Sequence, residues 1–275
     1  KFNNFKEQTY ETKRVMIKAR DGQKIPVSLI YKKGVTLKSA PLLMYGYGSY
    51  GLIVEPSFKL SFLPLVDEGF IFAIAHIRGG QDLGREWYDQ GRMMNKMNTF
   101  FDFIDCTKGL HKKDFGNKEK TFAMGGSAGG LLMGAIINME PTLYKGIVSA
   151  VPFVDVLTTM SDESIPLTTF EYKEWGNPSN RKEYFYIKKY SPYDNIESKP
   201  YPPVLVTSSL FDSQVQYFEP AKYVPKLREF STSNNPVLLK MNLIGGHAGK
   251  SGRLESLKET AEELSFIEYL ASRDY

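Results

Sequence analysis

Apolar residues in this chain fall into two kinds of segment, and their alternation along the sequence predicts the fold. Continuous apolar runs, typical of strands that are covered on both faces of a parallel sheet, occur at 41–48, 70–77, 120–124, 145–152, 202–209 and 235–243. Helical spacing of apolar residues occurs over 95–110, 131–139, 219–230 and 254–271. Strands that alternate with helices indicate a mostly parallel, twisted α/β sheet of about eight strands with helices on both faces.

The chain is expected to open with a hairpin. Two β-rich segments, 12–19 and 24–33, flank Asp21 and Gly22, which together form a strong hairpin-turn signal. The stretch 158–198 has a less regular pattern and is expected to be surface structure over the site.

A glycine-rich turn between a strand and a helix supplies the first candidate for chemistry. Residues 125–130 read GGSAGG, after the apolar run at 120–124 and before the helical run at 131–139. This order is that of a nucleophile elbow, in which a serine stands on a sharp turn with a strained backbone. Ser127 is therefore the expected nucleophile.

Composition narrows the function classes. The 275 residues, 42% of them hydrophobic and 24% charged, are consistent with a single domain over residues 1–275. The net charge of +4 comes from scattered Lys and Arg, so nucleic acid is not an expected partner. No apolar run is long enough to span a membrane. Cys106 is the only cysteine, which excludes an internal disulfide and fits a reducing, cytoplasmic location.

A serine nucleophile needs a base, and the chain has three histidines. His76 lies inside an apolar run and is expected to be a core residue. His111 lies in a lysine-rich segment and is expected to be solvated. His247 follows a strand, in the loop GGHAGKSG, where open α/β sheets place their ligands. It is the expected base.

The base needs an orienting acid, and Asp212 follows the strand at 202–209. The resulting chain order, Ser127, Asp212 and His247, is that of the α/β-hydrolase fold. Three other acids compete for the role, namely Asp155, Asp162 and Asp194. No metal or cofactor is expected.

Acyl transfer also requires hydrogen-bond donors for the developing oxyanion. The backbone N–H of Ala128 is one candidate. The segment YGYGSYG at 45–51 offers a second donor, and composition does not choose among Tyr45, Tyr47 and Tyr50.

Several long motifs resemble the peptidase domain of the oligopeptidase B group in the prolyl oligopeptidase family. They are YGYGSYG, HIRGGQDLGREWY, NTFFDFI, GGSAGGLLMGA, VPFVDVLTTM, EWGNP, YSPYDNI, YPPVLVT, DSQVQYFEPAKYVPKLR and GGHAGKSGR. The resemblance implies a serine endopeptidase for short peptides, with Ser127, Asp212 and His247 as its triad. It also implies that Tyr47 is the oxyanion donor that acts together with the Ala128 N–H.

Two departures from the family pattern shape the remaining expectations. Family members normally carry an N-terminal β-propeller over the active site, and this sequence, which begins at Lys1, has none. We therefore expect a piece of a longer protein, a processed form or a short member. The uncovered face would then self-associate or meet a propeller in a longer or separate chain.

The second departure concerns specificity. Cleavage after Arg or Lys is attributed in these relatives to two carboxylates before EWGNP; Glu171 matches the first, and Lys173 stands at the second. Phe153 is an expected apolar wall of that pocket. Glu55 matches one acidic position used for a basic P2 residue, and Ser57 replaces its companion. A reduced Arg/Lys preference is expected.

Two other functions remain open at this point. A carboxylesterase would use the same machinery, because activated esters are cleaved more easily than amides. A catalytically silent domain would instead act as an interaction module.

Overall fold

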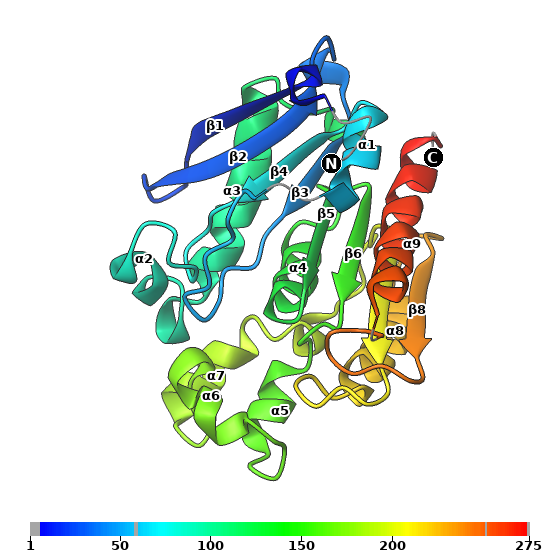
Figure 1. Ribbon diagram of the computed structural model, residues 1–275. Helices are drawn as coiled ribbons and strands as arrows, with labels where there is room; N and C mark the ends of the chain where they lie inside the picture. Colours follow the sequence, from blue (N-terminus) through cyan, green and yellow to red (C-terminus); the bar gives the residue numbers. More distant parts are fainter. Residues whose placement is uncertain (1–5, 58–59, 251, 274–275) are drawn as a thin grey trace.

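A single sheet organises the computed structural model, which describes residues 6–57, 60–250 and 252–273 (Figure 1). Within these ranges it has eight strands in the order β1-β2-β4-β3-β5-β6-β7-β8. From β4 to β8 all neighbouring strands are parallel, and β2 is antiparallel to both of its neighbours. The strands are β1 (Tyr10–Lys18), β2 (Lys24–Lys32), β3 (Leu42–Tyr45), β4 (Ile71–Ala75), β5 (Thr121–Gly126), β6 (Gly146–Ala150), β7 (Val204–Ser209) and β8 (Val237–Asn242).

The opening hairpin forms as predicted. β1 pairs with β2 along its whole length, from Tyr10 opposite Lys32 to Lys18 opposite Lys24. Gly22 lies in the turn with φ of +92°, a backbone conformation that glycine adopts without steric penalty.

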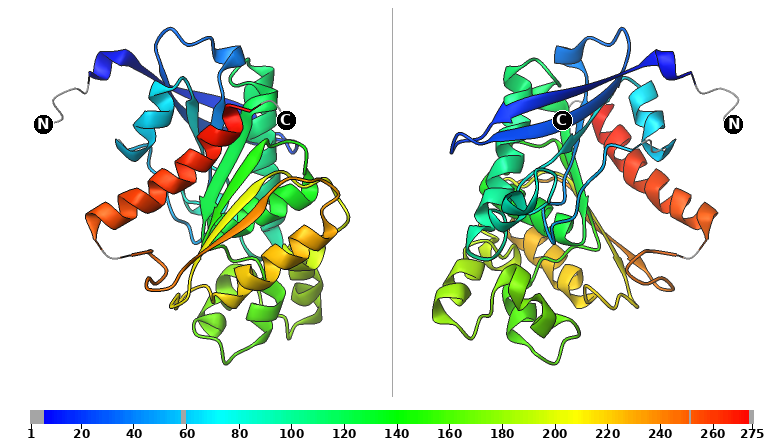
Figure 2. Two further views of the ribbon diagram at one scale, coloured as in Figure 1. Left: turned by 90° about the vertical axis from the view of Figure 1, so that its right-hand side faces the viewer. Right: turned by 60° about the vertical axis from the view of Figure 1, so that its left-hand side comes forward.

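Helices cover both faces of the sheet (Figure 2). One face packs against α3 (Met97–Lys112), α4 (Ala128–Met139) and α8 (Phe218–Phe230), and the other against α1 (Leu63–Asp67) and α9 (Arg253–Ala271). α4 is buried along nearly its whole length, which explains why its sequence is apolar all round. The predicted helices at 95–110, 131–139, 219–230 and 254–271 are thus present with small shifts at their ends.

The stretch at 158–198 is more regular than predicted. It lies beyond the carboxyl ends of the parallel strands in Figure 1 and contains most of α5 (Val156–Ser161) and all of α6 (Thr168–Trp175) and α7 (Arg181–Lys188). These helices have six to eight residues each, too few to show a clear apolar period. Leu167 and Gly176, both with positive φ, stand at the two ends of α6.

The remaining elements are short. They are α2 (Arg85–Asp89) and the 3₁₀ turns Glu7–Thr9, Leu37–Ser39, Leu60–Phe62, Met93–Asn95, Lys118–Lys120 and Tyr193–Asn195. Of the helices built from the described residues, none combines the length and the apolar character needed to cross a bilayer. The strand order, the single antiparallel strand inside the sheet and the helices on both faces match the α/β-hydrolase fold, which confirms the predicted fold class.

Candidate active site

Ser127 stands on a sharp, strained turn between β5 and α4. Its φ is 57° and its ψ is −118°, a conformation that side-chain-bearing residues rarely adopt. The turn is held by the Ser127 N–H, which donates to the Ala150 carbonyl at 2.8 Å. A Cβ atom on Gly125 would lie 2.5 Å from the Gly129 carbonyl oxygen. Small residues around Ser127 are therefore required for strand and helix to approach so closely, as the elbow pattern indicated.

Asp212 and His247 come together at the carboxyl ends of β7 and β8. Asp212 Oδ2 accepts a hydrogen bond from His247 Nδ1 at 2.7 Å. Its other oxygen, Oδ1, accepts from the backbone N–H groups of Gln214 and Val215 at 2.9 Å each. The Asp212 carboxylate is fully buried, whereas 16% of the His247 side chain is exposed. The imidazole thus has one nitrogen fixed by a rigid carboxylate, which leaves Nε2 available.

The three competing acids have other partners. Asp155 is buried and ion-paired with Lys222. Asp162 binds Ser164 in an exposed turn, and Asp194 accepts from the Ser191 hydroxyl at 2.6 Å.

The other two histidines lie away from this pair. His76 is buried, as expected, and both of its ring nitrogens have partners. The expectation for His111 was wrong: it lies in the last turn of α3, is buried, and its Nε2 lies 2.8 Å from Thr121 Oγ1. Burial lowers the pKa of His111 to about 4, so the ring is neutral. Cys106 is buried on the same helix, and burial raises the pKa of its thiol.

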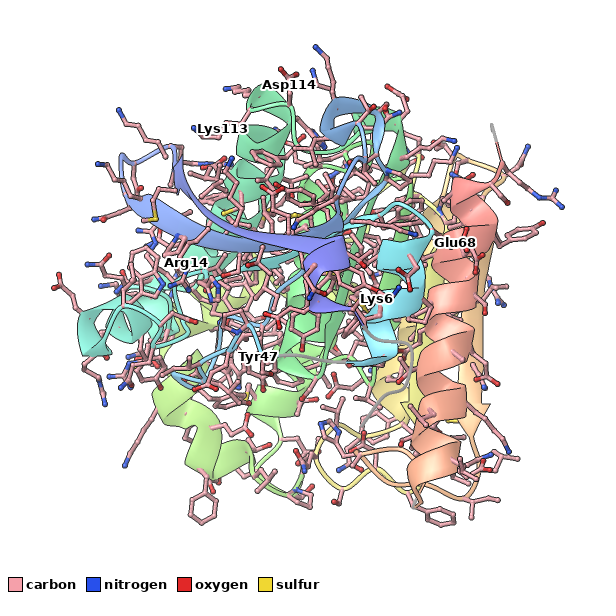
Figure 3. The ribbon with its side chains drawn as sticks, turned by 45° about the horizontal axis from the view of Figure 1, so that its top comes forward. Lys6, Arg14, Tyr47, Glu68, Lys113 and Asp114 are labelled. Carbon is pink, nitrogen blue, oxygen red and sulfur yellow. The ribbon has the colours of Figure 1, made fainter. Side chains whose placement is uncertain are left out.

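Tyr47, labelled in Figure 3, lies in the loop after β3, and its phenol is close enough to the Ser127 side chain to be influenced by it. Burial raises the pKa of Tyr47 to about 12, so its phenol keeps a proton to donate near neutral pH. Ala128 is the first residue of α4, where a backbone N–H has no helical carbonyl to bind. Both candidate donors therefore lie next to Ser127.

The loop that carries Tyr47 is braced by a buried lysine. Lys96, only 1% exposed, donates from Nζ to the Gly48 carbonyl and to Ser49 Oγ, each at 2.7 Å. Burial lowers the pKa of Lys96 to about 8, although the negative charge of Glu174 acts in the opposite direction and raises this pKa.

Glu174 braces the same loop from the other side. Its buried carboxylate accepts from the Tyr50 N–H at 2.8 Å and from the Tyr88 hydroxyl at 2.5 Å. Tyr50 itself has φ of 59°, so this contact helps to hold a strained residue.

Glu171 lies on α6, in contact with the same loop. Its Oε2 accepts from the Tyr50 hydroxyl at 2.8 Å and from Trp175 Nε1 at 2.7 Å. The buried Phe153 ring packs 5.3 Å from the Trp175 ring, centroid to centroid. Lys173 is exposed, and its carbonyl accepts from Arg92. The Glu171 carboxylate is thus held in one orientation by neutral donors beside an aromatic wall.

Glu55 and Ser57 are both exposed in the segment that follows the Tyr47 loop.

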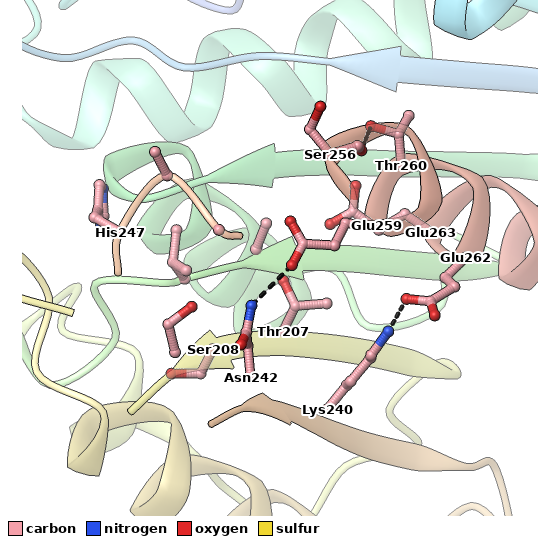
Figure 4. Close-up of a pocket in the computed structure, with 15 residues that line it drawn as sticks. Thr207, Ser208, Lys240, Asn242, His247, Ser256, Glu259, Thr260, Glu262 and Glu263 are labelled. Carbon is pink, nitrogen blue, oxygen red and sulfur yellow. Dashed lines mark hydrogen bonds and ion pairs between the residues drawn. The ribbon is translucent and has the colours of Figure 1, made fainter. Parts of the chain in front are cut away.

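His247 lines a cavity of about 250 Å³, together with Asn242 at the end of β8 and Glu259 on α9 (Figure 4). Glu259, from α9, accepts at Oε1 from Asn242 Nδ2 at 2.9 Å. The Asn242 side-chain oxygen in turn accepts from the N–H groups of Ile244 and Gly245, just before His247. Burial raises the pKa of the neighbouring Glu263 to about 7. These contacts fix the start of the histidine loop.

Large apolar side chains are exposed on the loops that carry these groups and on α6. Phe211 precedes Asp212 and is 65% exposed, and Ile244 precedes the histidine turn and is 80% exposed. Others are Leu52, Ile53, Phe170 and Leu243. We call these six side chains the apolar rim. Across the described part of the chain, no group of three or more His, Cys, Asp or Glu side chains is placed to hold a metal ion.

The profile that describes the prolyl oligopeptidase family matches residues 56–273. The chain belongs to this family. It is 54% identical over 260 residues to dipeptidyl aminopeptidase BI of Pseudoxanthomonas mexicana. This alignment covers 94% of this chain and 36% of that protein. It is 51% identical over 249 residues to protease 2 of Moraxella lacunata, in an alignment that covers 90% of this chain and 36% of that protein.

Solved structures agree with this assignment. Oligopeptidase B from Leishmania major superimposes with a TM-score of 0.96 at 45% identity, over 98% of this chain and 38% of that one. Oligopeptidase B from Trypanosoma brucei, solved with covalently bound antipain, gives a TM-score of 0.94 at 44% identity, over 98% of this chain and 39% of that one. The chain thus spans little more than a third of the length of these relatives and corresponds to their peptidase domain.

Sequence reasoning missed the brace around the Tyr47 loop. Lys96 lies between Asn95 and Met97 at the start of a predicted helix, a place where a lysine is ordinarily exposed. Glu174 was visible only as part of the EWGNP motif. An apolar context on both sides of a lone charge is the usual signal for a buried ion, and neither residue has it.

Proposed function

We propose that this chain is the peptidase domain of a serine oligopeptidase that hydrolyses short peptides through an acyl-enzyme. The observation that carries the proposal is the Asp212–His247 pair, joined at 2.7 Å, at the same end of the sheet as a serine with φ of 57°. The chain order is a strained elbow serine, then a buried carboxylate, then a histidine. This is the arrangement used for acyl transfer in the α/β-hydrolase fold.

The proposed steps assign one role to each group. Ser127 Oγ attacks the scissile carbonyl while His247 Nε2 accepts its proton, and Asp212 stabilises the resulting imidazolium. The Tyr47 hydroxyl and the Ala128 N–H donate to the oxyanion, and removal of one such donor typically costs about 3 kcal/mol. His247 then protonates the leaving amine. Water repeats the sequence on the acyl-enzyme and restores Ser127.

For the substrate, we propose peptides with Arg or Lys at P1. The Glu171 carboxylate keeps its charge available because its two partners, Tyr50 and Trp175, are neutral donors. Lys173 is exposed, which favours an orientation toward solvent over neutralisation of Glu171. Phe153 supplies an apolar wall for the aliphatic part of the substrate side chain. With one carboxylate in place of two, the preference is retained but reduced, and Glu55 is a candidate contact for a basic P2 residue.

The apolar rim suggests a partner for the face that carries the site. Exposed apolar side chains that gather on neighbouring loops are typical of surfaces covered by another domain or subunit. We propose that a propeller domain, in a longer or separate chain, or a second copy of this domain covers this face. A cytoplasmic location remains part of the proposal and rests on the single, buried cysteine.

The proposal is tested by labelling and turnover of the same preparation. A fluorophosphonate probe should label Ser127 in the parent, and the Ser127→Ala variant should lose that adduct. Turnover of short amide substrates with Arg, Lys, Phe and Pro at P1 should then favour Arg and Lys. Ester turnover without amide turnover would support the carboxylesterase, and no label at Ser127 would support a catalytically silent domain.

A further inference from the structure

A second Ser–His–Asp relay lies outside the proposed active site. Ser28 Oγ lies 2.8 Å from His76 Nε2, and His76 Nδ1 lies 2.8 Å from Asp82 Oδ1. The carboxylate contacts one ring nitrogen and the hydroxyl the other, which is the connectivity of a serine triad. Ser28 is on β2, separated from β5 in the sheet by β4 and β3. The relay therefore shares no residue with the Ser127 site.

The fold holds the histidine of this relay rigidly. The His76 N–H donates to the Pro26 carbonyl at 3.0 Å, and its carbonyl accepts from Trp87 Nε1 at 3.0 Å. The side chains of His76 and Asp82 are 1% and 7% exposed. With the Asp82 carboxylate as acceptor, the proton of a neutral ring lies on Nδ1, and Nε2 accepts from the Ser28 hydroxyl.

Unlike its two partners, Ser28 reaches a cavity. It is half-buried and lines a space of about 940 Å³ on the sheet face beside α1. Polar and charged side chains, among them Glu7, Lys13 and Lys33, form part of the wall of this cavity, and apolar side chains form the rest. The apolar side chains include Ile30, Leu63, Val66, Ile74 and the Phe62 and Phe72 rings, which stack 4.4 Å apart. An apolar chain can occupy this space while a carbonyl group approaches Ser28.

A cation stands beside the hydroxyl. Arg14 on β1 lies directly opposite Ser28 in the strand register, and its Nη2 lies 3.3 Å from His76 Nε2. The Arg14 side chain is exposed and is labelled in Figure 3. A guanidinium in this place can stabilise negative charge that develops on a carbonyl oxygen bound at Ser28.

We propose that Ser28, His76 and Asp82 form a second reactive serine centre, which takes esters with an apolar acyl chain. Ser28 Oγ bonds to the ester carbonyl carbon as its proton passes to His76 Nε2, and Arg14 faces the oxyanion. The bond to the alcohol then breaks, and the departing alkoxide takes the proton from His76. Water hydrolyses the acyl-Ser28 in the same two steps, so that ester and water give acid and alcohol.

The centre is expected to be slow. It has one exposed guanidinium where the proposed Ser127 site has two donors, and loss of an oxyanion donor typically lowers the rate by about 10²–10³. In the parent protein the faster reaction of Ser127 is therefore expected to mask the reaction of Ser28.

The test uses the whole chain with Ser127→Ala and a fluorophosphonate with a long alkyl chain. Peptide mass spectrometry should find one adduct, on Ser28, and the additional substitution Ser28→Ala should remove it. In the same Ser127→Ala protein, p-nitrophenyl octanoate should release a burst of one equivalent of nitrophenol, faster than p-nitrophenyl acetate does.

Asp82→Asn in the Ser127→Ala background should slow labelling of Ser28 at least about tenfold, because the wrong tautomer of His76 is then favoured. Arg14→Gln, at an exposed position, should slow it several-fold without loss of fold and serves where Asp82→Asn does not fold. No adduct on Ser28 would overturn the proposal, as would a labelling rate that neither substitution changes. Labelling of Ser127 in the parent reports separately on the proposed peptidase.

Discussion

Replacement of Lys96 by Met tests whether the brace around the Tyr47 loop serves catalysis. Methionine keeps most of the buried volume of the lysine stem but removes the ammonium that binds the Gly48 carbonyl and Ser49 Oγ. The Gly48 carbonyl would keep only the weaker bond from Thr99 Oγ1 at 3.4 Å, and a buried acceptor left without a partner costs about 1–3 kcal/mol. The substitution also removes the cost of burying the Lys96 ammonium, which is several kcal/mol, and this gain offsets much of the loss. The net change in stability is therefore expected to be small, about 1–2 kcal/mol.

The effect on catalysis should be larger than the effect on stability. Without its brace the loop moves to hydrate the two acceptors, and Tyr47 leaves the position in which it meets the oxyanion. The expected loss approaches the value of one oxyanion donor, about 3 kcal/mol, or roughly 10²-fold in kcat with little change in KM.

A double-mutant cycle measures this link. Tyr47→Phe alone should also lower kcat roughly 10²-fold, and the double variant should be no worse than the poorer single variant, since both remove the same interaction. Lys112→Met is the matched control and should leave kcat unchanged, because Lys112 is exposed at the far end of α3, the helix that begins directly after Lys96. Full activity in Lys96→Met, or losses that simply multiply in the double variant, would refute the reasoning.

Four further predictions follow from the site. Asp212→Asn and His247→Ala should each lower kcat by roughly 10⁴, whereas Asp155→Asn and Asp194→Asn should not; a larger loss in either of the latter would reassign the acid. Lys173→Glu should raise kcat/KM for Arg at P1 relative to Phe by about tenfold through one added charge contact of about 1–3 kcal/mol, and no gain would mean that Glu171 does not line the pocket. The pKa of Lys96 falls from its ordinary 10.5 to about 8 on folding, so kcat should fall a few-fold above pH 8 as the lysine loses its charge. Between about pH 8 and 10.5 the unfolded chain binds more protons than the folded one, so the free energy of unfolding should rise with pH; Lys96→Met should show neither trend. Light scattering should detect self-association that weakens in Ile244→Ser, and a monomeric parent would contradict the role given to the apolar rim.

The sheet and the elbow can be predicted from the sequence alone. Continuous apolar runs predict buried parallel strands, and the DG turn between two β-rich segments predicts a hairpin, because both signals are local. The elbow at Ser127 is local too, since only small residues fit where a strand and a helix meet so closely. Short helices at 158–198 escaped prediction because a helix of six to eight residues shows too little of its period.

The contacts between groups that are distant in the sequence depend on the three-dimensional fold. Chain order favours Asp212 over Asp155 and Asp194, but the contact of Asp212 with His247 is a property of two loops that follow different strands. Lys96 and Glu174 look like ordinary surface charges in the sequence, and the fold buries both around one loop. The same holds for Ser28, His76 and Asp82, which come from β2, the end of β4 and the loop after it. Pairing of polar groups across strands depends on register and topology, which no local pattern records.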